Sequence, residues 1–363
     1  MTKYYSINPN QINPEPLIQA AAVINAGGLV AFPTETVYGL GADGLRTDSV
    51  KKIYQAKGRP SDNPLILHIQ DVKEVEPLVK KITGPARILM DKFWPGPLTL
   101  IFEKSDLVPD TVSGGLHTVA IRLPENKIAR ELIRLAGTPI AAPSANTSGR
   151  PSPTKASHVL EDLDGKIDMV LDGGSCDIGL ESTVVDVTQD QPIILRPGKI
   201  TLEQLQELFP DASYDQHLVD RTETAKPRSP GMKYKHYAPK GELFLLDGDA
   251  EDVKDFILQH IHDKTAVLTF SEYPVGTQRE FSLGSIHCPE EGSKRLFDYL
   301  RMFDQQQIET IYAPLPPSDG MGFALCNRMF KAAGGKIITL KDGKYGLSNR
   351  TNDKKTSTGN SGN

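Results

Sequence analysis

Short apolar strand patterns alternate with amphipathic helix patterns along most of this chain, and that alternation constrains its fold more than any single motif. Residues 29–32 and 64–69 are short apolar segments of the strand type. Residues 47–57 carry apolar side chains at helical spacing, with Gly58 and Pro60 as stop signals. Segments of both kinds in alternation predict sheets covered by helices, and hence an α/β fold.

The alternation also divides the 363-residue chain, because the pattern is lost after residue 209 and resumes at residue 242. The intervening segment SPGMKYKHYAP, residues 229–239, is too rich in aromatic and basic residues for a simple spacer. We predict an α/β domain at residues 1–209, a linker at 210–241, a smaller Rossmann-like parallel α/β domain at 242–345 and a disordered tail at 346–363.

Composition limits the classes of function. A formal net charge of −5 leaves no broad basic surface for a nucleic-acid backbone. Cys176, Cys288 and Cys326 lie far apart, which argues against a disulfide framework or a zinc site and for a reducing compartment. The N-terminus has no apolar leader and no segment reaches transmembrane length, so we expect a cytoplasmic protein with no membrane partner.

The segment AKGRPSDNP, residues 56–64, places two cations, Lys57 and Arg59, on either side of a helix end. Two fixed cations with the amide of Asn63 nearby suit a polyphosphate. Each cation–phosphate pair is worth about 4 kcal/mol at about 4 Å and an effective dielectric of about 20, before desolvation. Basic residues at a helix C-terminus also complement the helix dipole, and this segment alone favours that simpler role.

Gly39, Gly41 and Gly44 match the spacing of the dinucleotide-binding fingerprint, but six residues separate them from the preceding strand. We reject that interpretation and expect these glycines to serve turns and close backbone approaches. A Walker loop is also absent, because Gly44 is followed by Leu45 and Arg46.

Two strand patterns carry polar side chains opposite their apolar face. His68 lies in one of them, residues 64–69, and a lone histidine there is more often structural than catalytic. Arg122 lies in the other, residues 118–123, and a buried arginine needs an anionic partner. A ligand carboxylate or a structural Asp or Glu would serve, and the sequence alone favours the structural partner.

Polar loops follow several strands, and ligands of open α/β sheets bind outside the carboxyl ends of strands. Residues 33–40 and 143–153 form such loops, and Arg196 lies at another strand end. Hydroxyl and amide side chains in loops also cap helices and make turns, so these loops do not identify a site by themselves.

Together, seven segments resemble the threonylcarbamoyl-AMP synthase family in its long, two-domain form. In chain order they are PTETVYGL at residues 33–40, AKGRPSDNP at 56–64, PSANTSGRPSPT at 143–154, ESTVVD at 181–186, LRPG at 195–198, SPGMKYKHYAP at 229–239 and GMGFALCNRMFKAAGG at 320–335. Each is weak alone, but their order is specific. The K-x-R and S-x-N pairs of the family are present as Lys57 with Arg59 and Ser144 with Asn146.

The resemblance implies a YrdC-like first domain, which is a twisted open mixed sheet with flanking helices. It also implies a nucleotidyltransferase that converts L-threonine, bicarbonate or CO2, and ATP into threonylcarbamoyl-AMP, pyrophosphate and water. The product feeds the N6-threonylcarbamoyladenosine (t6A37) modification of tRNA through a downstream tRNA threonylcarbamoyl transferase complex. Direct tRNA binding by this chain is expected to be weak or absent.

The resemblance also assigns residues, with Lys57 and Arg59 as catalytic groups that hold the phosphates. The implied ATP-binding residues are Lys57, Arg59, Asn63, Thr118, Ser144, Asn146, Ser152, Arg196, Tyr234 and His236. The implied threonine-binding residues are Thr34, His68, Arg122, Ala142 and Ser182, with Arg122 on the carboxylate. Tyr234 and His236 would close the linker over the site as a lid. Mg²⁺ is expected with ATP, and no protein ligand is assigned to it.

This residue set suits adenylyl transfer, which requires positioning and neutralisation of charge rather than a protein nucleophile. Three rivals are weaker. A module that binds tRNA or double-stranded RNA is disfavoured by the acidic net charge and the lack of stacked-aromatic motifs. A carbamoyltransferase-type enzyme that uses carbamoyl phosphate is disfavoured by the missing acylphosphatase-like and cysteine-rich zinc regions. A purely structural subunit is disfavoured by the many polar loops at strand ends.

Overall fold

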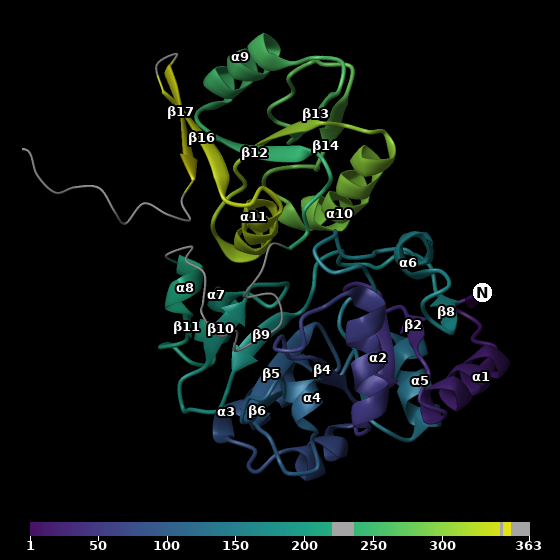
Figure 1. The fold of residues 1–363 in the computed structure, drawn as a ribbon. Helices are drawn as coiled ribbons and strands as arrows, with labels where there is room; N and C mark the ends of the chain where they lie inside the picture. The colour runs from purple at the N-terminus through teal and green to yellow at the C-terminus, as the bar shows by residue number, and fades with distance from the viewer. Residues whose placement is uncertain (220–235, 342–343, 350–363) are drawn as a thin grey trace, which may run out of the picture.

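The computed structural model describes residues 1–219, 236–341 and 344–349 and arranges them in two α/β domains, one above the other in Figure 1. An eleven-stranded sheet forms the first domain and a six-stranded sheet the second. This architecture confirms the predicted fold class, a large mixed sheet with flanking helices followed by a smaller and mostly parallel α/β domain.

The large sheet has the strand order β1-β8-β2-β3-β7-β4-β6-β5-β9-β10-β11. Its strands are β1 (Lys3–Ser6), β2 (Val30–Phe32), β3 (Gly39–Asp43), β4 (Ile66–His68), β5 (Leu98–Glu103), β6 (Thr118–Arg122), β7 (Ile140–Ala141), β8 (Met169–Asp172), β9 (Thr183–Asp186), β10 (Ile193–Arg196) and β11 (Ser213–Tyr214). The sheet is mixed, because β4 pairs in parallel with β6 but antiparallel with β7.

Helices cover both faces of this sheet. On one face, α1 (Pro14–Asn25) and α5 (Lys127–Ala136) pack together over β2 and β8. On the other, α2 (Thr47–Lys57) and α3 (Gly84–Phe93) contribute to a second core. The remaining helices of this domain are a 3₁₀ helix (Val72–Leu78), α4 (Asp110–Ser113), α6 (Ala156–Leu163), α7 (Leu202–Gln206) and α8 (Gln216–Val219).

The pairing of β4 with β6 places two predicted site residues side by side. His68 lies opposite Arg122 in the parallel register. Their neighbours Leu67 and Ile121 point into the core under α2 and α3. Because side chains alternate along a strand, His68 and Arg122 point to the other face, where they line the cavity of the candidate site.

The second domain has the strand order β14-β13-β15-β12-β16-β17. Its elements are β12 (Glu242–Asp247), α9 (Ala250–His260), β13 (Thr265–Thr269), β14 (Glu280–Ser282), α10 (Pro289–Gln305), β15 (Thr310–Pro314), α11 (Gly320–Ala332), β16 (Lys336–Lys341) and β17 (Lys344–Asn349). The pairs are parallel except that of β17 with β16, which is antiparallel.

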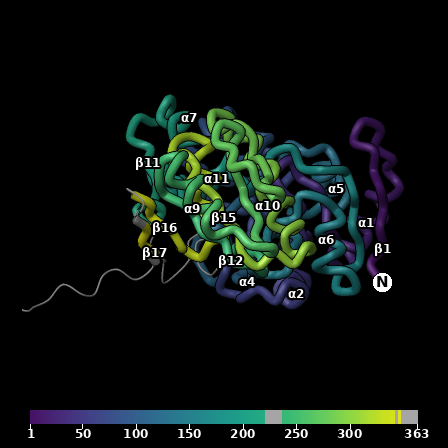
Figure 2. The backbone as a smooth tube through the Cα atoms, turned by 90° about the horizontal axis from the view of Figure 1, so that it is seen from above, coloured from purple at the N-terminus to yellow at the C-terminus, as the bar shows by residue number. Residues whose placement is uncertain are grey.

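The two domains share a hydrophobic core. α10 and α11 lie on the side of the second domain that faces the first, and α9 lies on the far side (Figure 1). Seen from above, α10 and α11 cross over the first domain, and α1 with β1 stays at one side (Figure 2). The core under α10 and α11 includes Val37, Ile178 and Leu180 from the first domain.

None of the helices in the described part of the chain combines the length and apolar character that a membrane crossing requires.

Two predicted boundaries are wrong. β11 pairs with β10 and α8 follows it, so the first domain extends beyond residue 209 into the predicted linker. β17 pairs with β16 as far as Asn349, so the second domain extends into the predicted tail. A two-residue strand such as β11 and a polar edge strand such as β17 carry little periodic signal. Residues 220–235 and 350–363, the rest of the predicted linker and tail, lie outside the described residues.

The glycines at positions 39, 41 and 44 lie in β3 and directly after it. The expected turn role is wrong for Gly39 and Gly41, which are strand residues. The expected close approach is confirmed at Gly44. A Cβ atom there would lie 2.5 Å from Leu67 Cδ2 and 2.7 Å from the carbonyl oxygen of Pro139.

We therefore expect Gly44→Ala to lower the free energy of unfolding by about 1–3 kcal/mol, because the added methyl group overpacks a backbone contact. Gly84→Ala is the matched control, since a Cβ atom on Gly84 would meet nothing within 4 Å. Urea denaturation of both variants measures the effect, and equal stability of Gly44→Ala and the wild type would contradict it.

Candidate active site

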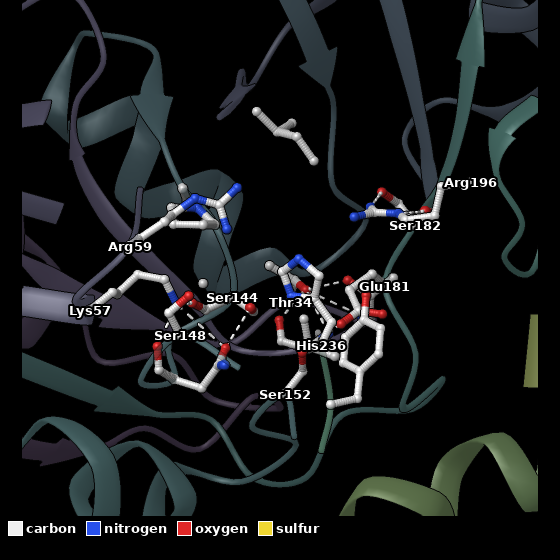
Figure 3. A pocket seen from close by; sticks show the side chains of 18 of the residues that line it. Thr34, Lys57, Arg59, Ser144, Ser148, Ser152, Glu181, Ser182, Arg196 and His236 are labelled. Atoms are coloured by element: carbon white, nitrogen blue, oxygen red, sulfur yellow. Dashed lines mark hydrogen bonds between the residues drawn. The ribbon is translucent and has the colours of Figure 1, made fainter. Parts of the chain in front are cut away.

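A cavity that is open to solvent lies on the face of the large sheet to which His68 and Arg122 point. Twelve predicted site residues line it, namely Thr34, Lys57, Arg59, His68, Arg122, Ala142, Ser144, Asn146, Ser152, Ser182, Arg196 and His236. Figure 3 shows Lys57 and Arg59 on one side of the cavity and Ser182 and Arg196 on the other. The structure thus gathers residues that are up to 202 positions apart, from Thr34 to His236.

Two predicted site residues within the described part of the chain are not among those that line the cavity. Asn63 is buried in the loop after Arg59. Thr118 begins β6, and Arg122 ends it, so the two residues are about 13 Å apart along the strand. The described lining of the cavity therefore does not include Asn63 or Thr118, and their role in ATP binding stays a prediction. Tyr234 lies outside the described residues.

Lys57 is the last residue of α2, and its ammonium group holds the loop that follows β7. Gly58 ends the helix in the left-handed conformation, at φ 61°, as the sequence predicts. The Lys57 Nζ donates to the carbonyl oxygen of Ser144 at 2.6 Å and also to that of Asn146. Burial, and after it the charge of Arg59, lowers the pKa of Lys57 well below its ordinary value.

The loop after β7 is ordered by its own hydrogen bonds as well. Ser144 Oγ donates to Asn146 Oδ1 at 2.6 Å, and Asn146 Nδ2 donates to the carbonyl oxygens of Thr147 and Arg150 at 2.9 Å each. The backbone N–H of Ser148 donates to the Lys57 carbonyl oxygen at 2.9 Å. The S-x-N pair and Lys57 of the K-x-R pair therefore form one structural unit at the cavity.

Arg122 has a structural partner, as the strand pattern favours. Its Nη2 lies 2.5 Å from Glu35 Oε1, its Nη1 donates to Thr36 Oγ1 at 2.9 Å, and its Nε donates to the Gly96 carbonyl oxygen at 3.3 Å. Burial alone would raise the pKa of Glu35, but the charge and hydrogen bond of Arg122 outweigh burial and lower it. The five-donor guanidinium still faces the cavity, so a ligand carboxylate remains compatible with this pair.

His68 is held neutral beside this ion pair. Its Nδ1 lies 3.2 Å from the Ile66 carbonyl oxygen, which assigns the proton to that nitrogen. Burial, and after it the charge of Arg122, lowers the pKa of His68 to about 3. The imidazole therefore adds no positive charge to the cavity at neutral pH.

Ser182 and Arg196 form the opposite wall. Arg196 Nε donates to the Ser182 carbonyl oxygen and its Nη2 donates to Ser182 Oγ, both at 3.0 Å. Ser182 Oγ also lies 2.7 Å from Thr99 Oγ1 on β5. On the loop after β2, Thr34 Oγ1 donates to the Val37 carbonyl oxygen at 2.6 Å, which fixes the local turn.

The cavity is strongly cationic. The described residues of its lining include Lys57, Arg59, Arg122, Arg150 and Arg196 and one carboxylate, that of Glu181. Glu35 and Asp162 pair with Arg122 and Arg150 from outside this lining. An excess of fixed positive charge in a partly enclosed site favours a polyanionic ligand. The described residues contain no group of three or more His, Cys, Asp or Glu side chains that could hold a metal ion.

Family models match two consecutive parts of the chain. Residues 22–198 match a family described as telomere recombination, and residues 200–334 match the C-terminal domain of threonylcarbamoyl-AMP synthase. The threonylcarbamoyl-AMP synthase of Bacillus subtilis is 47% identical over 331 residues, which cover 90% of this chain and 95% of the relative. This chain belongs to the threonylcarbamoyl-AMP synthase family. The resemblance inferred from the seven segments is confirmed.

Solved structures agree with this family assignment. The threonylcarbamoyl-AMP synthase of Pyrococcus abyssi is 45% identical over 328 residues, which cover 88% of this chain and 95% of the relative. The crystal structure of P. abyssi Sua5 complexed with L-threonine superimposes with a TM-score of 0.88 at 41% identity, covering 94% of this chain and 100% of that chain. The two-domain form of the synthase family therefore describes both the fold and the length of this chain.

The sequence patterns do not reveal Glu181, Arg150 or Tyr237 as site residues, although all three line the cavity. Glu181 and Ser182 are adjacent in the ESTVVD segment, and a carboxylate directly before a buried strand is the signal that could have indicated it. The charges of Arg328 and Arg196 outweigh burial and lower the pKa of Glu181 to about 2, so it is ionised at neutral pH.

The lowered pKa of His68 predicts a specific acid sensitivity. The unfolded chain binds a proton at this residue below about pH 6.5, whereas the folded protein does so only near pH 3. The stability that this group contributes is therefore full above pH 6.5 and falls as the pH drops below it, by about 2 kcal/mol at pH 5.

Urea denaturation of the wild type and of His68→Gln at pH 7.5 and pH 5 measures this effect. We expect the stability lost between the two pH values to be about 2 kcal/mol smaller in His68→Gln, which has no imidazole to titrate. An identical loss in both proteins would show that His68 is not held neutral by the fold.

Proposed function

We propose that this chain is an ATP-dependent nucleotidyltransferase that makes threonylcarbamoyl-AMP and pyrophosphate from L-threonine, bicarbonate or CO2, and ATP. The observation that carries the proposal is the cavity with five basic side chains and one carboxylate, in a member of the threonylcarbamoyl-AMP synthase family. The relative crystallised with L-threonine supports the choice of amino acid. A nucleotide with three phosphates accounts for the excess of positive charge.

The proposed reaction proceeds in two steps. The threonine amine first attacks the carbon of CO2 or bicarbonate and forms an N-carboxylate, with loss of a proton or of water. A carbamate oxygen then attacks the α-phosphorus of ATP, and the bond to pyrophosphate breaks. Negative charge grows on the pyrophosphate, and preorganised cations stabilise that charge without any protein nucleophile.

The nucleotide would bind along the wall formed by α2 and the loop after β7. Arg59 would contact the phosphates directly. Lys57 would act on them with its charge from behind the loop, because its ammonium already donates to the carbonyl oxygens of Ser144 and Asn146. Ser152 and Arg196 would complete the nucleotide contacts, together with the hydroxyl of Ser144 and the amide of Asn146.

Threonine would bind beside β4 and β6. The described contacts use three of the five N–H donors of Arg122, so two remain for the threonine carboxylate. Thr34, Ala142 and Ser182 would contact the side chain and the amine. Because His68 is neutral, it would place no positive charge beside the amine of the bound threonine.

Further parts of the proposal extend beyond the cavity. Mg²⁺ would arrive with ATP and be bound through its phosphates, which neutralises charge there. Tyr234 and His236 would close over the adenylate and exclude water, and of these two His236 lines the cavity. The product would pass in the cytoplasm to a tRNA threonylcarbamoyl transferase complex.

One experiment tests the proposed activity. The protein is incubated with ATP, bicarbonate and L-threonine, and the adenylate and pyrophosphate are measured by mass spectrometry and a pyrophosphate assay. We expect both products, and neither when threonine or bicarbonate is omitted. Tight, steeply salt-dependent RNA binding with no adenylate would instead support the nucleic-acid-binding rival.

Removing one cation tests the nucleotide wall. We expect Arg59→Met and Lys57→Met to lower kcat/KM for ATP roughly a hundredfold or more, which is the typical cost of one charge-stabilising donor. Lys51→Met is the matched control, because Lys51 lies on the exposed side of the same helix. Steady-state kinetics measures the effect, and rates within a few-fold of the control would refute the assignment.

A further inference from the structure

We infer that the second domain is part of the active-site machinery, and that two of its arginines, Arg301 on α10 and Arg328 on α11, are positioning residues for the nucleotide side of the cavity. The inference rests on the nucleotide site of the proposed function and adds residues and a domain to it. Both arginines are 0% exposed, and they are the two largest fully buried side chains of the described chain. A buried guanidinium requires partners, and both arginines bind carboxylates and carbonyl oxygens of the first domain.

Arg328 reaches the cavity through Glu181. Its Nε donates to Glu181 Oε2 at 2.8 Å, and its Nη2 donates to the Pro197 carbonyl oxygen at 3.0 Å. The other carboxylate oxygen of Glu181 accepts from Ser152 Oγ at 2.5 Å. Glu181 and Ser152 both line the cavity. Arg328 therefore positions the Glu181 carboxylate, and that carboxylate positions the Ser152 hydroxyl at the nucleotide side of the cavity.

Arg301 holds the outer side of the loop after β7. Its Nη2 donates to the Pro151 carbonyl oxygen at 2.6 Å, and its two terminal nitrogens bind both carboxylate oxygens of Asp162, at 3.1 and 2.9 Å. Asp162 also accepts from the backbone N–H of Thr147 at 3.0 Å and pairs with Arg150. The loop is thus tied to the first domain by Lys57 and to the second domain by Arg301.

Two close contacts keep the arginines in place. A Cβ atom on Gly179 would lie 2.5 Å from the Cα atom of Lys294 and 2.5 Å from the Ser293 carbonyl oxygen, so the backbones of the two domains touch at α10. Tyr237 stacks on Phe297 of the same helix, with ring centroids 5.1 Å apart. Close-packed contacts of this kind do not let α10 and α11 withdraw without repacking the interface.

Loss of Arg328 should act on the nucleotide without any contact between the two. Glu181 would lose the larger of the two arginine charges that keep it ionised, which shifts its balance towards the protonated form that burial favours. Ser152 would in turn lose its fixed acceptor. Loss of Arg301 would free the Pro151 carbonyl group and leave Asp162 with one arginine partner fewer. Each change removes one of the links between the second domain and the loop after β7, directly for Arg301 and through Glu181 for Arg328.

The test measures the affinity of full-length variants for AMPPNP, a non-hydrolysable ATP analogue, by calorimetry well below each unfolding temperature, alongside kcat/KM for ATP. We expect the Kd to rise at least tenfold in Arg328→Met and in Arg301→Met, and less in Arg328→Lys, which keeps one donor to Glu181. Arg295→Met is the matched control, because Arg295 lies on α10 but is half-exposed, and its partners, Glu291 and the Ser282 carbonyl oxygen, belong to the second domain. Its Kd should change less than twofold.

The double variant Glu181→Gln with Arg328→Met separates positioning from folding. It removes the stranded carboxylate, so its unfolding temperature should recover relative to Arg328→Met, while its Kd for AMPPNP stays at least tenfold above the wild type. Wild-type affinity in folded Arg328→Met and Arg301→Met, or affinity that returns with stability in the double variant, would overturn the inference. Calorimetry measures binding without turnover. A wild type that binds AMPPNP but makes no adenylate would therefore refute the proposed function and leave the positioning role of the two arginines standing.

Discussion

The ammonium group of Lys57 is buried against the carbonyl oxygens of Ser144 and Asn146, and the shape of the cavity depends on this contact. A buried cation is costly unless it is hydrogen-bonded, and three loop oxygens supply the partners. The same contact brings the end of α2 and the loop after β7 together. The ammonium group of Lys57 therefore lies at the wall of the site before any anion binds. Such preorganisation is what charge stabilisation requires.

The large sheet determines the other wall of the cavity. Side chains alternate along its strands, so neighbouring residues point in turn to the core and to the cavity. His68 and Arg122 are neighbours since β4 and β6 pair in parallel in one register. A slip of one residue would turn both into the core and expose Leu67 and Ile121. The buried pair of Arg122 with Glu35 balances the charge of Arg122 at this wall.

Much of this could be predicted from the sequence, but contacts between distant residues could not. Periodicity and stop signals locate α2 and its end at Gly58, and the ordered segments identify the family. The same patterns do not show whether Lys57 donates to backbone carbonyl oxygens or binds a phosphate. Its carbonyl partners lie 87 and 89 positions away in the sequence. They also miss Glu181 with Arg328, which are 147 positions apart in different domains. Thr118 shares β6 with Arg122 but lies at the other end of that strand, a separation that the sequence pattern does not show.

A crystal structure with AMPPNP and L-threonine tests the central claim most directly. The account predicts that the phosphates lie within hydrogen-bond distance of Arg59 and the loop after β7, with the threonine carboxylate at Arg122. A nucleotide bound elsewhere, for example at the carboxyl ends of the strands of the six-stranded sheet, with the cavity unchanged, would contradict it.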